Sequence, residues 1–359
     1  MFTAWEYNFK MLKAHYLYYP LHFKRPAGTS RGVLLHKASW FFQVWADENP
    51  AMRGIGEVSV IPGLSLDNEK EIPKELETIS QNPDDLHAWI AAKGDQFPAI
   101  RFGIETALAD LQKGGKQIFH TNTFTEGKTG IPINGLIWMG DPDFMHNQIL
   151  EKLEAGFNCI KIKVGAIDFE QEIVLIQQLR SQFSPQSIEI RLDANGAFAV
   201  EDALQKLNRL ADYNIHSIEQ PIKAGQAEAM AALCQKSPIP IALDEELIGV
   251  KNTQIADLLN AIKPHYVILK PSLLGGFSIA NEWITAAKKR QIGWWATSAL
   301  ESNIGLNAIA QWVSEKKSDM PQGLGTGQLY TNNIASPLEI REAKLYYNPK
   351  ISWQNSYGR

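Results

Sequence analysis

The chain has 359 residues, of which 45% are hydrophobic and 21% are charged, and its formal net charge is -4. This weakly acidic balance gives no general reason to expect nucleic acid or an anionic membrane surface as a partner. No run of about 18 uncharged apolar residues occurs, and residues 1–16 lack the apolar core of a signal peptide. We therefore expect a soluble, cytoplasmic protein with one large domain and one smaller domain.

The first third of the chain has the pattern of a small α+β domain. Up to about residue 60, polar residues alternate with apolar and aromatic residues, which is typical of an antiparallel meander. Segments 67–79, 84–94 and 96–113 then show helical periodicity. We therefore place an α+β domain at residues 1–125.

From residue 131 the pattern changes to short apolar runs, each followed by an amphipathic helix. Eight such runs, the last of them weak, recur at a spacing of 20 to 30 residues, which indicates parallel βαβ units. Eight units close naturally into a (β/α)₈ barrel, although pattern alone also allows an open, doubly wound sheet. We assign this domain to residues 126–334. Strand-like alternation resumes in the tail, 335–359, which we expect to return to the N-terminal domain.

Charged side chains interrupt these runs near their carboxyl ends, where parallel barrels build their active sites. Asp193, Glu219, Asp244 and Lys270 follow one another at steps of 26, 25 and 26 residues, so they occupy consecutive strands, the third to the sixth. Neighbouring strands lie about 4.8 Å apart, which lets the three carboxylates converge on one point. A single acid of this kind could equally be a helix cap or a surface residue.

Three convergent carboxylates raise one another's pKa unless a cation neutralises them. Because the ligands are all oxygen, with no His or Cys among them, the set favours Mg²⁺, with Mn²⁺ also suitable. We predict that Asp193, Glu219 and Asp244 bind this metal. Glu245 and Glu246, which follow directly, are expected to support or cap the site, since adjacent strand positions face apart.

Two lysines, Lys161 and Lys163, lie one residue apart in an apolar run and therefore point to the same face of the second strand. Lys270 lies on the sixth strand, which is opposite the second in a ring of eight. Metal binding of a carboxylate substrate acidifies its α-proton, and removal of that proton requires a neutral base. Burial and a like-charged neighbour both lower a lysine pKa. We assign Lys163 as the base, Lys161 as its neighbour that favours the neutral form, and Lys270 as a second acid/base or a stabilising cation.

In this order the motifs resemble those of the enolase superfamily and its muconate-lactonizing subgroup. They are Lys-x-Lys at 161–163, "DAN" at 193–195, "EQP" at 219–221, "DE" at 244–245 and "LKPS" at 269–272. The resemblance covers nearly the whole chain. It implies an α/β fold, a modified TIM barrel of the (β/α)₇β form with an N-terminal α+β capping domain, and Mg²⁺ as cofactor. By the same analogy, residues 25–32 and 60–65 of the capping domain lie over a small carboxylate substrate.

Segments 133–140, 297–312 and 323–330 resemble the o-succinylbenzoate synthase family within that subgroup. The resemblance implies syn dehydration of 2-succinyl-6-hydroxy-2,4-cyclohexadiene-1-carboxylate in menaquinone biosynthesis, with Lys163 as base and then as acid. Ser302 or Asn303 is placed to cap the helix after the seventh strand, whose free N–H groups either bind the succinyl carboxylate or are only capped. The residues assigned to substrate binding are Asn195, Ser298, Glu301, Ser302 and Asn303.

Other functions use the same scaffold. Opposed lysines suit the proton transfer of an N-acylamino acid racemase as well as an elimination. A dipeptide epimerase usually carries an Asp-x-Asp after the eighth strand, where this chain reads "GTGQLYTNN", and the loops do not match a muconate cycloisomerase. A catalytically silent barrel predicts a broken ligand or base, and none is broken. The sequence does not indicate the oligomeric state.

Overall fold

The structure is a computed structural model in which residues 11–29, 32–138, 140–165, 167–316 and 318–353 are described. The predicted lack of a signal peptide rests partly on residues 1–10, which lie outside these ranges. Among the described residues, no helix has both the length and the apolar character needed to cross a membrane.

The N-terminal part contains the predicted strands and helices, but the strands are not a simple meander. Strands β2 and β3 form a hairpin of their own, and the other three strands form an antiparallel sheet of order β1-β4-β5. Strand β1 therefore pairs with β4 instead of with the next strand in sequence. The strands are β1 (Leu12–Tyr18), β2 (Leu21–Thr29), β3 (Gly32–Lys37), β4 (Ser39–Ala46) and β5 (Gly54–Ser59). We refer to β1–β5 with the three following helices as the capping domain.

Three helices follow close to the predicted segments: α1 (Ile72–Gln81), α2 (Leu86–Lys93) and α3 (Pro98–Gln112). A glycine allows α3 to approach β5 closely, because a Cβ atom at Gly56 would lie only 1.9 Å from the carbonyl oxygen of Gly103. A separate cluster of buried side chains from β4, β5, α1 and α3 forms the core of the capping domain.

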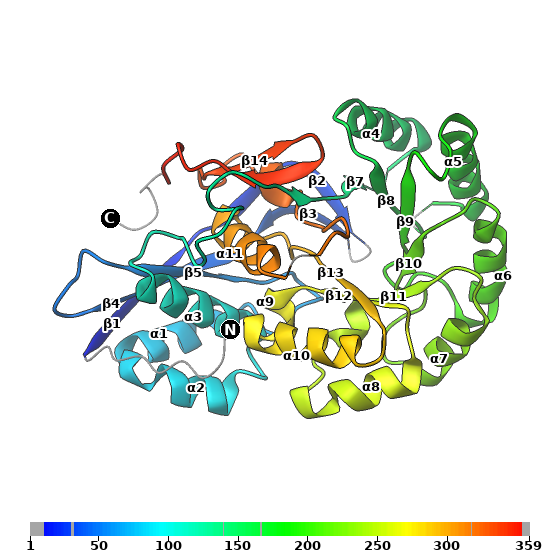
Figure 1. Cartoon of the computed structure of the whole chain (residues 1–359). Helices are drawn as coiled ribbons and strands as arrows, with labels where there is room; N and C mark the ends of the chain where they lie inside the picture. Colours follow the sequence, from blue (N-terminus) through cyan, green and yellow to red (C-terminus); the bar gives the residue numbers. More distant parts are fainter. Residues whose placement is uncertain (1–10, 30–31, 139, 166, 317, 354–359) are drawn as a thin grey trace.

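In the second part, the described residues form one curved parallel sheet of seven strands in the order β13-β12-β11-β10-β9-β8-β7 (Figure 1). The predicted eighth run is not a strand. Instead, Gln322 and Gly323 make single parallel bridges to Ile133 and Thr297, which closes the ring between the two ends of the sheet. The predicted modified TIM barrel with a capping domain is confirmed. The strands are β7 (Gly135–Ile137), β8 (Cys159–Lys163), β9 (Glu189–Asp193), β10 (Ser217–Glu219), β11 (Ile241–Leu243), β12 (Tyr266–Leu269) and β13 (Gly293–Ala296).

Helices connect these strands and cover the outside of the sheet, except that α11 lies between the sheet and β5 (Figure 1). The alternation in β8 is consistent with helices on the outside of the sheet. Ile160 and Ile162 are fully buried in the main core, while Lys161 and Lys163 face the interior of the barrel. The helices are α4 (Pro142–Glu154), α5 (Phe169–Gln182), α6 (Val200–Ala211), α7 (Ala227–Lys236), α8 (Ile255–Ile262), α9 (Pro271–Leu274), α10 (Gly276–Lys288) and α11 (Asn303–Ser314).

The tail forms the predicted strand-like structure. Strands β14 (Leu338–Arg341) and β15 (Lys344–Tyr347) form an antiparallel pair, and β15 also pairs with β6 (Ile131–Pro132). Trp353 packs on a small cluster that includes Phe41 of β4, so the tail contacts the capping domain as well. The domain boundaries at residues 125 and 334 stay a prediction.

Candidate active site

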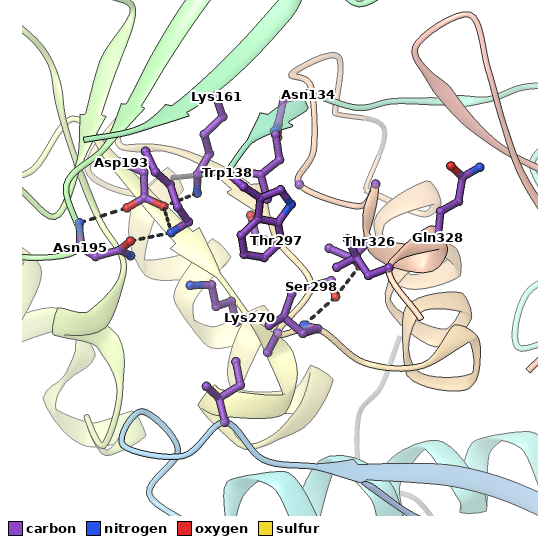
Figure 2. Close-up of a pocket in the computed structure, with 18 of the residues that line it drawn as sticks. Asn134, Trp138, Lys161, Asp193, Asn195, Lys270, Thr297, Ser298, Thr326 and Gln328 are labelled. Carbon is purple, nitrogen blue, oxygen red and sulfur yellow. Dashed lines mark hydrogen bonds and ion pairs between the residues drawn. The ribbon is translucent and has the colours of Figure 1, made fainter. Parts of the chain in front are cut away.

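A cavity of about 330 Å³ lies at the carboxyl ends of the barrel strands, where the sequence places the site (Figure 2). Ile61 and Leu64 of the capping domain line it, as expected for segment 60–65, whereas the described residues between 25 and 32 do not. The polar and charged residues of its wall are Asn134, Lys152, Lys161, Lys163, Asp193, Asn195, Glu245, Lys270, Thr297, Ser298, Thr326 and Gln328.

The pairing of neighbouring strands determines where the predicted metal ligands and Lys163 lie. Lys163 pairs with Asp193, and Asp193 pairs with Glu219, so these three residues lie side by side on β8, β9 and β10. Glu219 pairs with Ala242, which places Asp244 two residues further along the chain, after the end of β11. This offset follows from the tilt of barrel strands, because residues at one height on neighbouring strands are displaced in register.

Lys161 lies between two of the predicted metal ligands. Its Nζ atom is 2.6 Å from Oε2 of Glu219 and 2.9 Å from Oδ2 of Asp193, and all three side chains are buried. Burial alone would lower the pKa of Lys161, but the charges of Asp193 and Glu219 outweigh burial and raise it. The paired carboxylates therefore favour the ammonium form of Lys161. The assignment of Lys163 as the neutral base stays a prediction.

Lys163 also points into the cavity. Its Nζ atom donates to Oδ2 of Asp193 at 3.1 Å and to Oδ1 of Asn195 at 2.5 Å. Asn195 has a left-handed backbone, with φ of 44°, and its amide donates to Oε1 of Glu245 at 3.1 Å. Asn195 and Glu245 therefore orient the predicted base from the side, and Glu245 supports the site as expected.

Lys270 approaches from a different wall of the cavity than Lys161 (Figure 2). It follows β12 directly and donates a short hydrogen bond to Oδ2 of Asp244. Burial opposes its charged form, but the carboxylates of Asp244 and Glu219 raise the pKa of Lys270. The structure thus places ammonium groups from β8 and from the end of β12 around the carboxylates, as predicted.

The three carboxylates experience one another's charge. Burial raises the pKa of Glu219, and the charges of Asp193 and Asp244 raise it further. For Asp193, burial acts in the same direction, but the ammonium groups of Lys161 and Lys163 hold its pKa below the ordinary value. In Glu219, burial and two like charges therefore outweigh the contact with Lys161, a condition that a further cation relieves.

The donor set fits a hard cation, although its oxygens do not surround one point in this arrangement. Within the described ranges, no group of three or more His, Cys, Asp and Glu side chains is placed to hold a metal ion. The lysines are the reason, because Lys161 occupies the position where Asp193 and Glu219 converge. Oε1 of Glu219 is buried without a hydrogen-bond partner, which leaves one oxygen available as a ligand. A shared site of Asp193, Glu219 and Asp244 stays a prediction that requires the ammonium groups to withdraw.

The residues assigned to substrate binding separate into two groups. Asn195 and Ser298 line the cavity, whereas Glu301, Ser302 and Asn303 do not. Glu301 and Ser302 are fully buried behind Ser298, whose hydroxyl donates to Oε2 of Glu301 at 2.6 Å. The side chain of Asn303 donates to the carbonyl of Ile334 at 2.6 Å. The side chains of Glu301, Ser302 and Asn303 therefore contact other residues of the protein and support the wall of the cavity from behind.

Ser302 caps α11 as predicted, but the N–H groups of this helix do not face the cavity as free donors. The Oγ atom of Ser302 accepts a hydrogen bond from the N–H of Ile304. The N–H groups of Ser302 and Gly305 donate to the carboxylate of Glu57, and the N–H of Asn303 donates to the side chain of Asn333. Of the two alternatives for these N–H groups, the structure favours capping, because side chains of the protein already accept their hydrogen bonds.

Sequence reasoning missed two buried polar residues. Gln220 has a φ of 40°, and its Oε1 atom accepts hydrogen bonds from the N–H groups of Asp244 and Glu246, which fixes the chain after β11. The "EQP" motif was a signal for this residue. Glu57 had no comparable signal, because its partners lie 245 and 248 residues away.

Comparisons with known proteins agree with this architecture. A family model described as enolase C-terminal domain-like matches residues 145–345. The chain is 50% identical over 351 residues to an o-succinylbenzoate synthase of Desulfotalea psychrophila, covering 89% of this chain and 95% of that protein. It is 27% identical over 251 residues to a hydrophobic dipeptide epimerase of Enterococcus faecalis, covering 68% and 67%.

Among solved structures, MenC from Desulfotalea psychrophila LSv54 superposes with a TM-score of 0.84 and 45% sequence identity. That superposition covers 94% of this chain and 100% of the other. The match spans the capping domain and the barrel together, and the family model covers more than half of the chain. The protein therefore belongs to the enolase superfamily, within its enolase C-terminal domain-like family.

Proposed function

We propose that the protein is an o-succinylbenzoate synthase. The reaction is the syn dehydration of 2-succinyl-6-hydroxy-2,4-cyclohexadiene-1-carboxylate to 2-succinylbenzoate, a carbon–oxygen lyase step that serves menaquinone biosynthesis. The proposal is supported by 50% identity to a synthase over 89% of the chain, a much closer relation than the 27% identity to the epimerase.

The distribution of charge in the cavity is the observation that carries the proposal. The acidic residues of the described wall are Asp193 and Glu245, and both are engaged by the lysine cluster and by Asn195. Elsewhere the wall carries the further cation Lys152, with Thr326, Gln328 and apolar side chains, and no other acidic residue of the described wall. An acid with an apolar ring suits this wall, whereas the ammonium group of a dipeptide would lack a free carboxylate partner.

Lys163 is the residue that transfers the proton. As the free amine it takes the proton α to the ring carboxylate, and the electron pair of that C–H bond becomes part of an enediolate. The electron pair then forms the new ring double bond as the C–O bond on the same face breaks. The departing hydroxide takes the proton back from Lys163 and leaves as water, so the amine is restored. Lys270, on another wall, stabilises the negative charge of the enediolate.

Asp193, Glu219 and Asp244 would hold the divalent cation, Mg²⁺ or Mn²⁺. Such a cation acidifies the α-proton because it attracts the negative charge that develops on the substrate carboxylate. The ammonium groups of Lys161 and Lys270 contact these carboxylates and would move aside when the cation binds.

The test is incubation of the purified protein with the cyclohexadiene substrate and Mg²⁺, following aromatisation by absorbance. We expect loss of water and formation of 2-succinylbenzoate. In a second arm, an N-acylamino acid is incubated in deuterium oxide, where solvent deuterium at an α-carbon of inverted configuration reports racemisation. Racemisation without aromatisation would replace the proposed synthase by a racemase. Absence of both reactions, with Mg²⁺ bound, would indicate a binding protein.

A further inference from the structure

Two buried carboxylates of the capping domain reach the N-termini of neighbouring barrel helices. Glu57 of β5 accepts hydrogen bonds from the N–H groups of Ser302 at 2.9 Å and Gly305 at 3.0 Å, at the start of α11. Glu105 of α3 accepts a hydrogen bond from the N–H of Phe277 at 2.8 Å, at the start of α10. Each carboxylate satisfies helix N–H groups that otherwise lack partners, and its charge complements the helix dipole.

The Glu57 contact lies close to the cavity along the chain. Ser298 and Leu300 line the cavity, and Ser302 follows Leu300 by two residues. Leu300 has a φ of 62°, a left-handed conformation that is unfavourable for a leucine, so its surroundings must hold it. Its carbonyl accepts a hydrogen bond from the hydroxyl of Tyr330 at 2.7 Å. The segment from 298 to 302 is therefore a constrained part of the wall, anchored by Glu57 at its end.

Glu57 fits this position tightly. Its side chain is fully buried and also accepts hydrogen bonds from the hydroxyls of Ser302 and Ser39. A Cβ atom at Gly305 would lie 3.1 Å from Oε2 of Glu57 and 2.7 Å from Cβ of Glu301. Glycine at this helix position thus leaves room for the carboxylate of Glu57 from the capping domain and for the side-chain stem of Glu301 behind the cavity wall.

We propose that Glu57 is a positioning residue that couples the docking of the capping domain to the shape of the catalytic cavity. It does so through Ser302 and Gly305, which set where Ser298 and Leu300 meet the substrate. Glu105 makes a similar contact without this consequence, because Phe277 and the residues before it back to Pro271 do not line the cavity. The kinetic part of this inference rests on the proposed function, whereas its structural part does not.

The first measurement compares Glu57→Gln with Glu105→Gln by steady-state kinetics. The amide of Glu57→Gln keeps the size of the side chain but turns a donor toward an N–H group, so one helix contact is lost. We expect KM to rise about tenfold and kcat to change less than about threefold, since substrate positioning is affected more than proton transfer. In Glu105→Gln we expect a lower melting temperature with an unchanged KM.

The second measurement is amide hydrogen exchange of the peptide spanning residues 297–305, which does not depend on turnover. We expect exchange at least about tenfold faster in Glu57→Gln than in the wild type, and unchanged in Glu105→Gln. If Glu57→Gln does not fold, Ser302→Ala removes one donor to the same carboxylate and is expected to accelerate exchange in the same peptide.

Three results would overturn the inference. The first is an unchanged exchange rate in folded Glu57→Gln, or in Ser302→Ala if that variant replaces it. The second is an unchanged KM in Glu57→Gln. The third is a rise of KM in Glu105→Gln that equals the rise in Glu57→Gln. If the wild type does not aromatise the substrate, the proposed function fails. The exchange experiment then still decides whether Glu57 holds the wall.

Discussion

Buried carboxylates occur in both the barrel and the capping domain, and those of the active site have different partners from two that cap helices. In the barrel, Asp193 and Glu219 contact the ammonium group of Lys161. In the capping domain, Glu57 and Asp67 accept hydrogen bonds from backbone N–H groups at the starts of α11 and α3. Ammonium groups on flexible side chains can withdraw when a ligand arrives, whereas backbone N–H groups are fixed by their helix. The first arrangement suits a reactive site and the second suits permanent docking.

The pKa values of Asp193 and Asp67 shift in opposite directions. Lysine charges hold the pKa of Asp193 below its ordinary value against the effect of burial. For Asp67, burial dominates over the helix N–H groups and raises the pKa to about 7. At Asp193 the ammonium groups thus outweigh burial, whereas at Asp67 the backbone N–H groups do not.

The largest expected effect comes from removing the base. Lys163→Ala should lower turnover by at least about 10³-fold, because the same amine both takes and returns the proton. Metal binding should remain nearly intact, as measured by calorimetric titration with Mg²⁺, since Lys163 is not one of the predicted ligands. Lys236→Ala, at an exposed position of α7, is the control and should keep full activity. Normal turnover of Lys163→Ala would remove the base assignment.

Glu219→Gln should separate activity from stability. We expect Mg²⁺ affinity and turnover to fall by about 100-fold, because a charged ligand is lost. The melting temperature without metal should rise, because the neutral amide removes a buried charge next to Asp193 and Asp244. Titration with Mg²⁺ and a thermal melt in a chelating buffer measure the two effects. A lower melting temperature would mean that the contact with Lys161 outweighs the like-charge repulsion.

Asp67→Asn tests the capping domain through pH. The pKa of Asp67 is about 7 in the folded protein, above its ordinary value of 3.8, so the folded state binds the proton more tightly. The stability from this group is fully present below pH 3.8 and is lost as the pH rises through 7. Between pH 5 and 8, the free energy of unfolding of the wild type should fall by on the order of 2 kcal/mol more than that of Asp67→Asn.

Chemical denaturation at each pH measures the Asp67 effect. Asp110 provides a graded comparison, because burial raises its pKa to about 6 and Asp110→Asn should act in the same direction over a lower pH range. Parallel stability curves for the wild type and Asp67→Asn would contradict the prediction.

The smallest effect is expected at a neutral residue of the cavity wall. Ser298→Ala removes the hydroxyl that donates to Glu301 and accepts from Thr326 at 2.9 Å, but leaves Glu57 and α11 in place. We expect KM to rise by about threefold with little change in kcat. Thr285→Ala, on the exposed face of α10, is a matched loss of a hydroxyl and should not change KM. A strong loss of kcat would instead place Ser298 in the chemistry.

The sequence was sufficient for the parts of the site that follow the βα repeat. The spacing of Asp193, Glu219, Asp244 and Lys270 predicted their common location, and the alternation around Lys161 predicted its inward direction. Both signals are local, since they depend only on strand periodicity and unit length. The fold class followed from the same repeat and from the motifs it carries.

Other features could not be predicted because they depend on distant pairings. Nothing local to β5 shows that Glu57 meets α11, and the pairing of β1 with β4 skips the β2–β3 hairpin. The direction of the Lys161 pKa depends on the distances to Asp193 and Glu219, which strand order alone does not give. Tertiary contacts decided each of these outcomes.

The closure of the ring at residues 322–323 has a mechanical consequence. Elsewhere the barrel is joined by ladders of paired residues, but at this seam single bridges connect Gln322 to Ile133 and Gly323 to Thr297. A circumferential stretch of the barrel should therefore concentrate at this seam, next to the part of the wall that holds Gly325 and Thr326. A bulky ligand that enters the cavity would therefore widen the barrel at this seam. The strands on the opposite side, which carry the lysines and carboxylates, would keep their distances from one another.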